Sequence, residues 1–348
     1  MQMASHDTLK LKTVPQFTGG KTYLVEVEQA RKSWIIDEIR SLPLYPLERP
    51  VEIADPPQVV ATRICDSNRL RSISAKYSNC EAQCKNSSYS KFVVNLYAGS
   101  NNGTIVEVMR LSGCGLAYRK EREAIINAAQ GLGSVIESKF PCSNVMRIPD
   151  EFLKKYQPPT RNDQEEVLSR AVDRIHSQHR DERLFTLQNL SSLTSSDKVN
   201  CESARQLSEL ILLNTFDIRD IMFELINVVK PECDEINCKT QNACVSIFAN
   251  CLNNLSRSRE LEQILEQGNN DFVEPMVRSL FVVIKKCYCP FNTSISLECL
   301  GLLLKCSPIA HGQINEEYKM FVRKAESVGE QRHRNLQLKA KLALEAMN

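Results

Sequence analysis

The sequence predicts a multidomain chain, in which a small α+β domain is followed by an all-α domain built as an α-solenoid. Apolar residues make up 42% of the 348 residues and charged residues 25%, which is the composition of a folded chain. Between about residues 59 and 131, apolar residues alternate as they do in strands. From about residue 150 onward they recur at helical spacing instead. A chain of this length accommodates two domains.

Residues 1–57 are expected to form a lead-in and a proline-rich linker. Residues 21–28 alternate as a strand does, and residues 29–40 favour a short helix around Trp34. Five prolines then follow closely, and each removes an amide donor and biases the residue before it away from the helical region. They are Pro43, Pro46, Pro50, Pro56 and Pro57. This stretch is therefore expected to be extended.

Residues 58–135 are expected to form the α+β domain. Strands are predicted over 71–77, 91–97 and 104–110, because β-branched or aromatic residues alternate in each. Residues 98–103 are rich in glycine and asparagine, which tolerate positive φ, so the last two strands should form an antiparallel hairpin. A helix over 116–130, ending at Gly131, should pack on the sheet.

A linker over residues 136–160 is expected to lead to a helical domain over 161–348. The predicted helices are 164–176, 181–194, 201–213, 218–229, 240–255, 259–266, 272–286, 294–306 and 315–347, the last broken near Gly329. Their connections are short and polar, and several helices follow a capping residue such as Asn200 or Asp271. Short connections favour antiparallel neighbours, and hence the stacked helix pairs of a solenoid. Three apolar segments resemble one another, but without the fixed period of a strict array.

Charge, hydropathy and cysteine usage narrow the function classes. With 44 Lys and Arg against 42 Asp and Glu, the net charge is +2, so no nucleic-acid partner is expected. No apolar run approaches the length of a transmembrane helix, and residues 1–11 lack the apolar region of a secretion signal. Most of the 14 cysteines lie in apolar, helix-like stretches, where cysteine is a small buried hydrophobe. We therefore expect an intracellular, cytoplasmic location, with the nucleus left open.

Patterns for catalysis, metal or cofactor binding are weak. The cysteine pairs are not CxxC and lie far apart, unlike the ligands of a structural zinc site. The glycine pairs Gly113/Gly115 and Gly131/Gly133 lack a complete phosphate-binding pattern. We expect no catalytic, cofactor-binding or metal residues. An enzyme with a cryptic cysteine site remains a remote alternative, because a Cys–His pair can meet in space without a local signature.

Positive charge gathers in the α+β region. Residues 58–131 contain ten Lys and Arg against five Asp and Glu. The candidate contacts to an anionic lipid or to a partner are Arg110, Arg119, Lys120 and Arg122. A solvated helix face with local ion pairs accounts for the same pattern.

Two family resemblances follow from these segments. The sequence TIVEVMRLSG, followed by LAYRKEREAIINAA, resembles the end of the kinase-associated domain 1, in which a hairpin leads through a basic, an apolar and a small residue and a glycine into the final helix. This resemblance implies binding of anionic phospholipid through a basic surface. The C-terminal helices, with the segment HRDERLFTLQNLSSLT, resemble armadillo/HEAT-type helical repeat proteins, which implies an armadillo-like superhelix.

The leading hypothesis is a non-catalytic scaffold or adaptor for protein–protein interaction. Stacked helix pairs form an extended concave surface, which suits a peptide or protein ligand better than a small molecule. The alternative, from a different class, is a peripheral membrane adaptor that binds anionic phospholipid through the basic α+β domain.

Overall fold

The structure is a computed structural model that describes residues 34–132, 159–228, 234–258, 260–266, 271–287 and 289–348. The expected strand over 21–28, the start of the expected helix over 29–40 and most of the expected linker over 136–160 lie outside these residues. We call residues 34–132 the sheet unit and residues 159–348 the helical unit. Each has its own cluster of buried apolar side chains. The prediction of an α+β part followed by a helical part is thereby confirmed.

The sheet unit contains a five-stranded antiparallel sheet in the order β1-β5-β4-β3-β2. The strands are β1 (Val51–Ile53), β2 (Ser74–Ser78), β3 (Glu81–Lys85), β4 (Lys91–Ala98) and β5 (Thr104–Ser112). As predicted, β4 and β5 pair as a hairpin, and Asn101 and Asn102 in the connection have positive φ.

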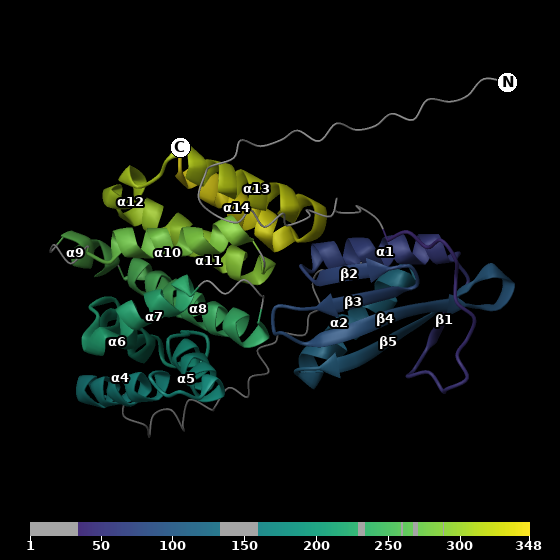
Figure 1. The fold of residues 1–348 in the computed structure, drawn as a ribbon, viewed down its shortest axis with the longest axis horizontal. Coiled ribbons are helices and arrows are strands. Elements are labelled where there is room, and N and C mark those ends of the chain that lie inside the picture. Colours follow the sequence, from purple (N-terminus) through teal and green to yellow (C-terminus); the bar gives the residue numbers. More distant parts are fainter. Residues whose placement is uncertain (1–33, 133–158, 229–233, 259, 267–270, 288) are drawn as a thin grey trace. The chain divides into compact units, whose positions relative to one another are not determined.

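Two helices contribute to the core of the sheet unit, α1 (Pro57–Leu70) and α2 (Gly115–Ala129) (Figure 1). Phe92, Val94 and Leu96 share one face of β4, because side chains alternate along a strand, and all three are fully buried. They share a core with Ile64 of α1 and Ile125 of α2. We did not expect α1. Its Pro57 occupies the first helical turn, where proline is favoured.

The sheet unit also takes in residues that we expected to be linker or helix. Residues 34–40 are not helical. Trp34 is 1% exposed, stacks on Tyr77 of β2 and donates its indole N–H to the carbonyl of Asn79. A tryptophan ring removes a large apolar area from water, and this burial outweighs the local preference for helix. The core of the unit therefore includes residues before position 58.

The strap, residues 40–50, connects this core to β1. The Ala98 N–H donates to the carbonyl of Arg40 at 2.8 Å, and the Glu48 N–H donates to Glu107 Oε1 at 2.7 Å. Glu107 is fully buried and also accepts a hydrogen bond from the Tyr97 hydroxyl at 3.2 Å. Arg40 forms a parallel β-bridge beside Tyr97, whereas the contacts of Glu107 lie on the sheet face opposite the helices, because Tyr97 alternates with Leu96. The strap therefore lies over that second face.

The helical unit contains most of the helices that the periodicity predicts. They are α4 (Arg161–Ile175), α5 (Arg180–Leu193), α6 (Cys201–Leu212), α7 (Ile218–Asn227), α8 (Glu235–Arg257), α9 (Glu260–Glu266), α10 (Val273–Lys286), α11 (Pro290–Cys306), α12 (Pro308–Gly312), α13 (Glu316–Arg332) and α14 (Arg334–Ala346). α8 and α11 begin earlier than predicted, and α12 was not predicted. Among the described residues, no helix is both long and apolar enough to cross a bilayer.

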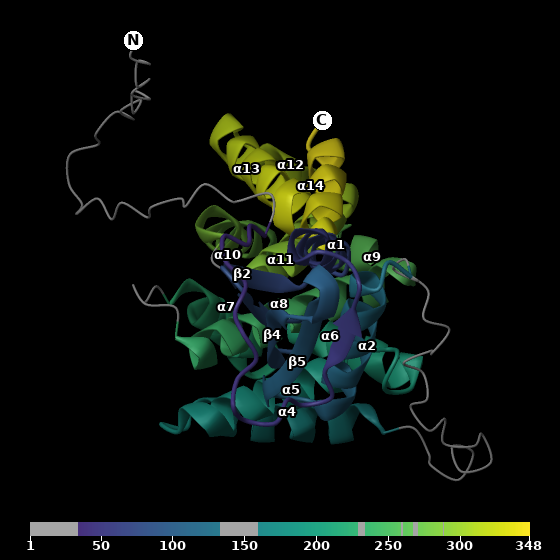
Figure 2. The same cartoon turned by 90° about the vertical axis from the view of Figure 1, so that its right-hand side faces the viewer.

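The long helices α8 and α11 pack against each other in the centre of the helical unit. α5 and α6 pack on α8, while α14 packs on α11 and pairs with α13 (Figure 2). The break that we expected near Gly329 occurs at His333, because α13 continues to Arg332 before the chain turns into α14. Gly329 lies close to α14, because a Cβ placed there would meet backbone atoms of Leu336 and Gln337.

Candidate functional site

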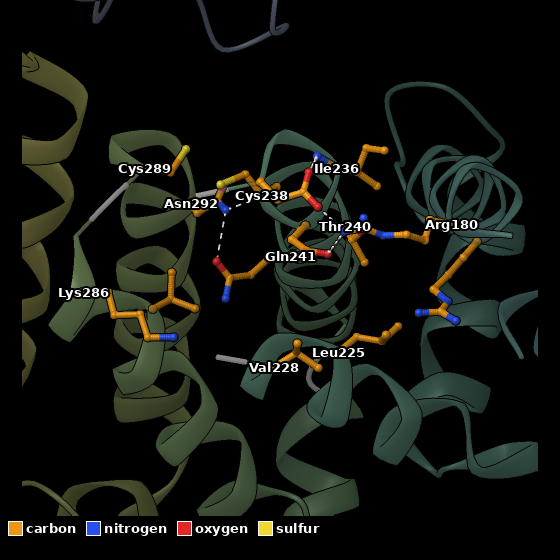
Figure 3. Close-up of a pocket in the computed structure, with 14 residues that line it drawn as sticks. Arg180, Leu225, Val228, Ile236, Cys238, Thr240, Gln241, Lys286, Cys289 and Asn292 are labelled. Carbon is orange, nitrogen blue, oxygen red and sulfur yellow. Dashed lines mark hydrogen bonds and ion pairs between the residues drawn. The ribbon is translucent and has the colours of Figure 1, made fainter. Parts of the chain in front are cut away.

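The candidate site is a pocket of about 340 Å³ in the helical unit (Figure 3). It lies between the first turns of α5, α8 and α11 and the last turns of α7 and α10. α5, α8 and α11 run parallel to one another and antiparallel to α7 and α10, so three amino-terminal helix ends lie together. Since the amino end of a helix carries a partial positive charge, this arrangement favours a negatively charged ligand.

Lys286 supplies a positive charge from the last turn of α10. Its side chain extends into the pocket (Figure 3) and is half-buried. Burial lowers the pKa of its ammonium group from the ordinary lysine value. Within the described residues, no hydrogen bond or ion pair to this ammonium group occurs. The group is therefore available to a ligand.

Arg180 and Asn237 also line the pocket. Arg180 pairs with Asp234, the cap of α8, and donates to Asn237 Oδ1 at 2.8 Å, which ties α5 to α8. The Nδ2 of Asn237 is buried and has no hydrogen-bond partner among the residues that the structure describes. A buried donor without an acceptor costs free energy, so the wall of the pocket carries an unsatisfied amide at this point.

Asn292 fixes the relative position of α8 and α11. It is fully buried, and its Nδ2 donates to the carbonyl of Cys238 at 3.0 Å and to Gln241 Oε1 at 3.3 Å. Its Oδ1 accepts from Asn242 Nδ2 at 3.0 Å and from the Tyr89 hydroxyl at 3.1 Å. Because every polar atom of this amide is paired, the wall of the pocket is held in one arrangement.

The ionisable side chains of the pocket are mostly basic or paired. Its described lining residues include no histidine, and their single carboxylate, Asp234, is paired with Arg180. Among the described residues, no group of three or more His, Cys, Asp and Glu side chains could hold a metal ion.

The basic residues predicted from the sequence lie elsewhere, in the sheet unit. Arg110 lies two residues before the end of β5, donates to the carbonyl of Gly113 at 3.2 Å and is exposed. Arg119 is exposed on α2, Lys120 is half-exposed, and Arg122 donates to the carbonyl of Arg49 at 2.7 Å. None of the four lines the pocket.

Two exposed leucines accompany these basic residues, and sequence reasoning missed them. Leu111 and Leu116 lie on either side of the β5–α2 turn and are 60% and 78% exposed. The feature of the sequence that could have indicated them is their position at the two ends of the glycine-containing stretch 111–116. We call residues 110–120 the basic–apolar turn.

The pocket residues were also missed by sequence reasoning. Lys286 ends an amphipathic helix, where a lysine is common for reasons of helix polarity alone. Nothing local in the sequence indicates that the first turns of α5, α8 and α11 converge. Tertiary packing alone brings them to one site.

Comparison with protein-family models, with curated proteins and with solved structures finds no significant match. Function must therefore be inferred from the pocket and from the exposed surfaces themselves.

Proposed function

We propose that the protein is a non-catalytic scaffold or adaptor, whose helical unit binds a peptide or protein segment at the pocket. The bound group is an acidic side chain or a terminal carboxylate of that segment. The half-buried Lys286 ammonium group, which has no partner in the described residues, is the observation that carries this proposal.

The physical reason is charge and hydrogen-bond complementarity. A carboxylate in the pocket would accept a hydrogen bond from the Lys286 ammonium group. Among the described residues, no side chain caps the first turn of α11, so its amides add a favourable field for an anion. Leu225, Val228 and Val283 line the same pocket and would contact apolar side chains beside the acidic group.

We also propose that the helical unit is an armadillo-like superhelix. Antiparallel packing of α7 with α8 and of α10 with α11, with α8 and α11 parallel to each other, supports an armadillo-like superhelix. In such a superhelix a peptide ligand would run along the helix ends, and the pocket would bind one part of that peptide. The resemblance of the sheet unit to the kinase-associated domain 1 belongs to the second candidate function below.

Replacing Lys286 by glutamate should weaken peptide binding by about tenfold to a hundredfold, because a charge-assisted hydrogen bond contributes about 1.5–3 kcal/mol. Peptides would be selected from a displayed random 12-residue library on the full chain, and their affinities measured by fluorescence anisotropy. We expect the selected peptides to share an acidic group next to aliphatic residues.

The matched control is Lys305→Glu, the same charge reversal on an exposed residue at the other end of α11, about 20 Å away at 1.5 Å per residue. This variant should bind the selected peptides as the unaltered chain does. Equal affinities for the Lys286 variant and the unaltered chain would contradict the proposed site, as would equal losses in both variants.

The second candidate function is a peripheral membrane adaptor, and the basic–apolar turn favours it. Leu111 and Leu116 are exposed next to Arg110 and Arg119, a combination that could insert apolar side chains between anionic headgroups. A basic residue near an anionic surface contributes about 1 kcal/mol.

On this candidate, Leu111→Ser with Leu116→Ser should lower partitioning onto phosphatidylserine vesicles by about tenfold, because both apolar contacts are lost. Arg119→Glu with Lys120→Glu should reduce it further at low salt and less at high salt. Vesicle sedimentation measures both effects.

Leu338→Ser with Leu342→Ser provides the control, since these leucines of α14 are similarly exposed at 47% and 53%. A loss of the same size in this pair, or no binding by the unaltered chain, would remove the membrane candidate.

A further inference from the structure

The strap presents a proline-rich motif on the surface of the sheet unit. Residues 40–46 read Arg-Ser-Leu-Pro-Leu-Tyr-Pro, with the apolar–proline pairs Leu42-Pro43 and Tyr45-Pro46 spaced by three residues. Leu42 and Tyr45 are 51% and 55% exposed, and Leu44 is fully exposed. Neighbouring large apolar side chains on a surface commonly mark an interaction site.

The spacing matches a polyproline II helix, which has three residues per turn. In that conformation Arg40, Pro43 and Pro46 share one edge, and Leu42 and Tyr45 share the next. Each apolar–proline pair then presents a continuous apolar surface, and the arginine lies one turn before the first pair. SH3 domains recognise such segments through a groove lined by aromatic side chains.

We propose that residues 40–46 are a docking site for an SH3-type domain. The two apolar–proline pairs occupy two apolar subsites of its groove, and Arg40 pairs with an acidic subsite at one end. This site is separate from the pocket of the helical unit and does not depend on the function proposed for that pocket.

The structure leaves the motif accessible between two anchors. The strap is held by the Arg40 carbonyl, which accepts from Ala98, and by the Glu48 N–H, which donates to Glu107. Between these points the chain bends at Leu44 and Tyr45, so the segment must straighten when it is bound. The motif is therefore fixed at its ends and exposed in its middle.

The side-chain contacts that oppose this straightening are weak. The Tyr45 hydroxyl lies 3.4 Å from the Tyr97 hydroxyl, which is a long hydrogen bond. Arg40 Nη2 lies 3.9 Å from Glu81 Oε2 on the surface, where an ion pair contributes little. Arg40 can therefore exchange Glu81 for an acidic group of the partner domain at small cost.

The test uses the full chain against an array of purified SH3 domains that have acidic residues beside the groove. We expect micromolar binding by at least one of them. Pro43→Ala with Pro46→Ala should reduce that binding at least tenfold, and Arg40→Glu should do the same. Pro50→Ala, which changes a proline of the strap outside the motif, should leave binding within twofold of the unaltered chain.

Two further measurements distinguish the contribution of the motif from that of the contacts that hold the strap on the sheet. Tyr45→Phe keeps the aromatic ring and removes the contact with the Tyr97 hydroxyl, so binding should be retained or strengthened. A synthetic peptide of residues 38–49 should compete with the full chain for the same domain. Circular dichroism would confirm that each variant is folded.

Three results would overturn the proposal. The first is binding of the peptide without binding of the full chain, since the strap would then be locked against the sheet. The second is the absence of binding by both. The third is binding that the double proline change leaves intact, since the contact would then lie elsewhere on the chain.

Discussion

Gly329→Leu is expected to separate α14 from α13 and to lower the free energy of unfolding by about 3 kcal/mol or more. A Cβ at Gly329 would lie 2.3 Å from the backbone nitrogen of Gln337 and 2.8 Å from its Cα. Because these are backbone atoms, no side-chain rotation can relieve the overlap. Leu336 and Ala340 of α14, both fully buried, would lose their contacts as the helix is displaced. Urea denaturation followed by circular dichroism measures the loss.

The matched control is Gly301→Ala in α11, where a Cβ meets no atom within 4 Å. Alanine is favoured over glycine inside a helix, so this variant should gain about 0.5–1 kcal/mol. Gly329→Ala should still be destabilising despite the same helix preference. A stabilising effect of Gly329→Ala would contradict the close approach of the two helices.

Lowering the pH is expected to destabilise the folded protein through His333. This histidine lies between α13 and α14, is 1% exposed and accepts a hydrogen bond at Nδ1 from the Leu336 N–H at 3.4 Å. Its ring contacts Phe291 edge-on, with the ring centres 5.1 Å apart. Burial lowers the pKa of His333 to about 4, because the interior disfavours the charged imidazolium.

The direction in which pH changes the stability follows from comparing the protonation of His333 in the folded and unfolded chains. Below pH 6.5 the histidine of the unfolded chain takes up a proton, whereas in the folded protein it stays neutral until about pH 4. The stability present above pH 6.5 is therefore lost as the pH falls through this window, by as much as about 3 kcal/mol at 1.36 kcal/mol per pKa unit. Urea denaturation at a series of pH values from 7.5 to 4 measures the slope.

His333→Asn should remove most of this slope, since an asparagine side chain can still cap α14 and carries no charge. His311→Asn, on an exposed residue, is the control and should leave the slope unchanged. An unaltered slope in the His333 variant would contradict the assignment.

Glu235 changes the stability in a lower pH range, because Lys239 and Lys91 lower the pKa of its carboxyl to about 2. Its contribution is lost between about pH 4.5 and 2, below the histidine window.

Secondary structure followed the local pattern where one face of an element is apolar. The helix predicted over 272–286 is α10, and the strands predicted over 91–97 and 104–110 are β4 and β5. β3 was missed because Glu-Ala-Gln-Cys-Lys has little preference for strand, and it is extended since it pairs with strands on both sides. α1 was missed because Val59, Val60 and Ala61 resemble the start of a strand.

The sequence by itself determined the order of an α+β part and a helical part, the β4–β5 hairpin and most of the helices, because periodicity reports which side of an element is apolar. Tertiary structure alone decided that Trp34 belongs to the sheet core, that Gly329 is a packing contact, and that Lys286 and Asn237 share a pocket. Periodicity cannot specify which element covers an apolar face. That choice depends on contacts between residues far apart in the chain, and the pocket exists only once those contacts have formed.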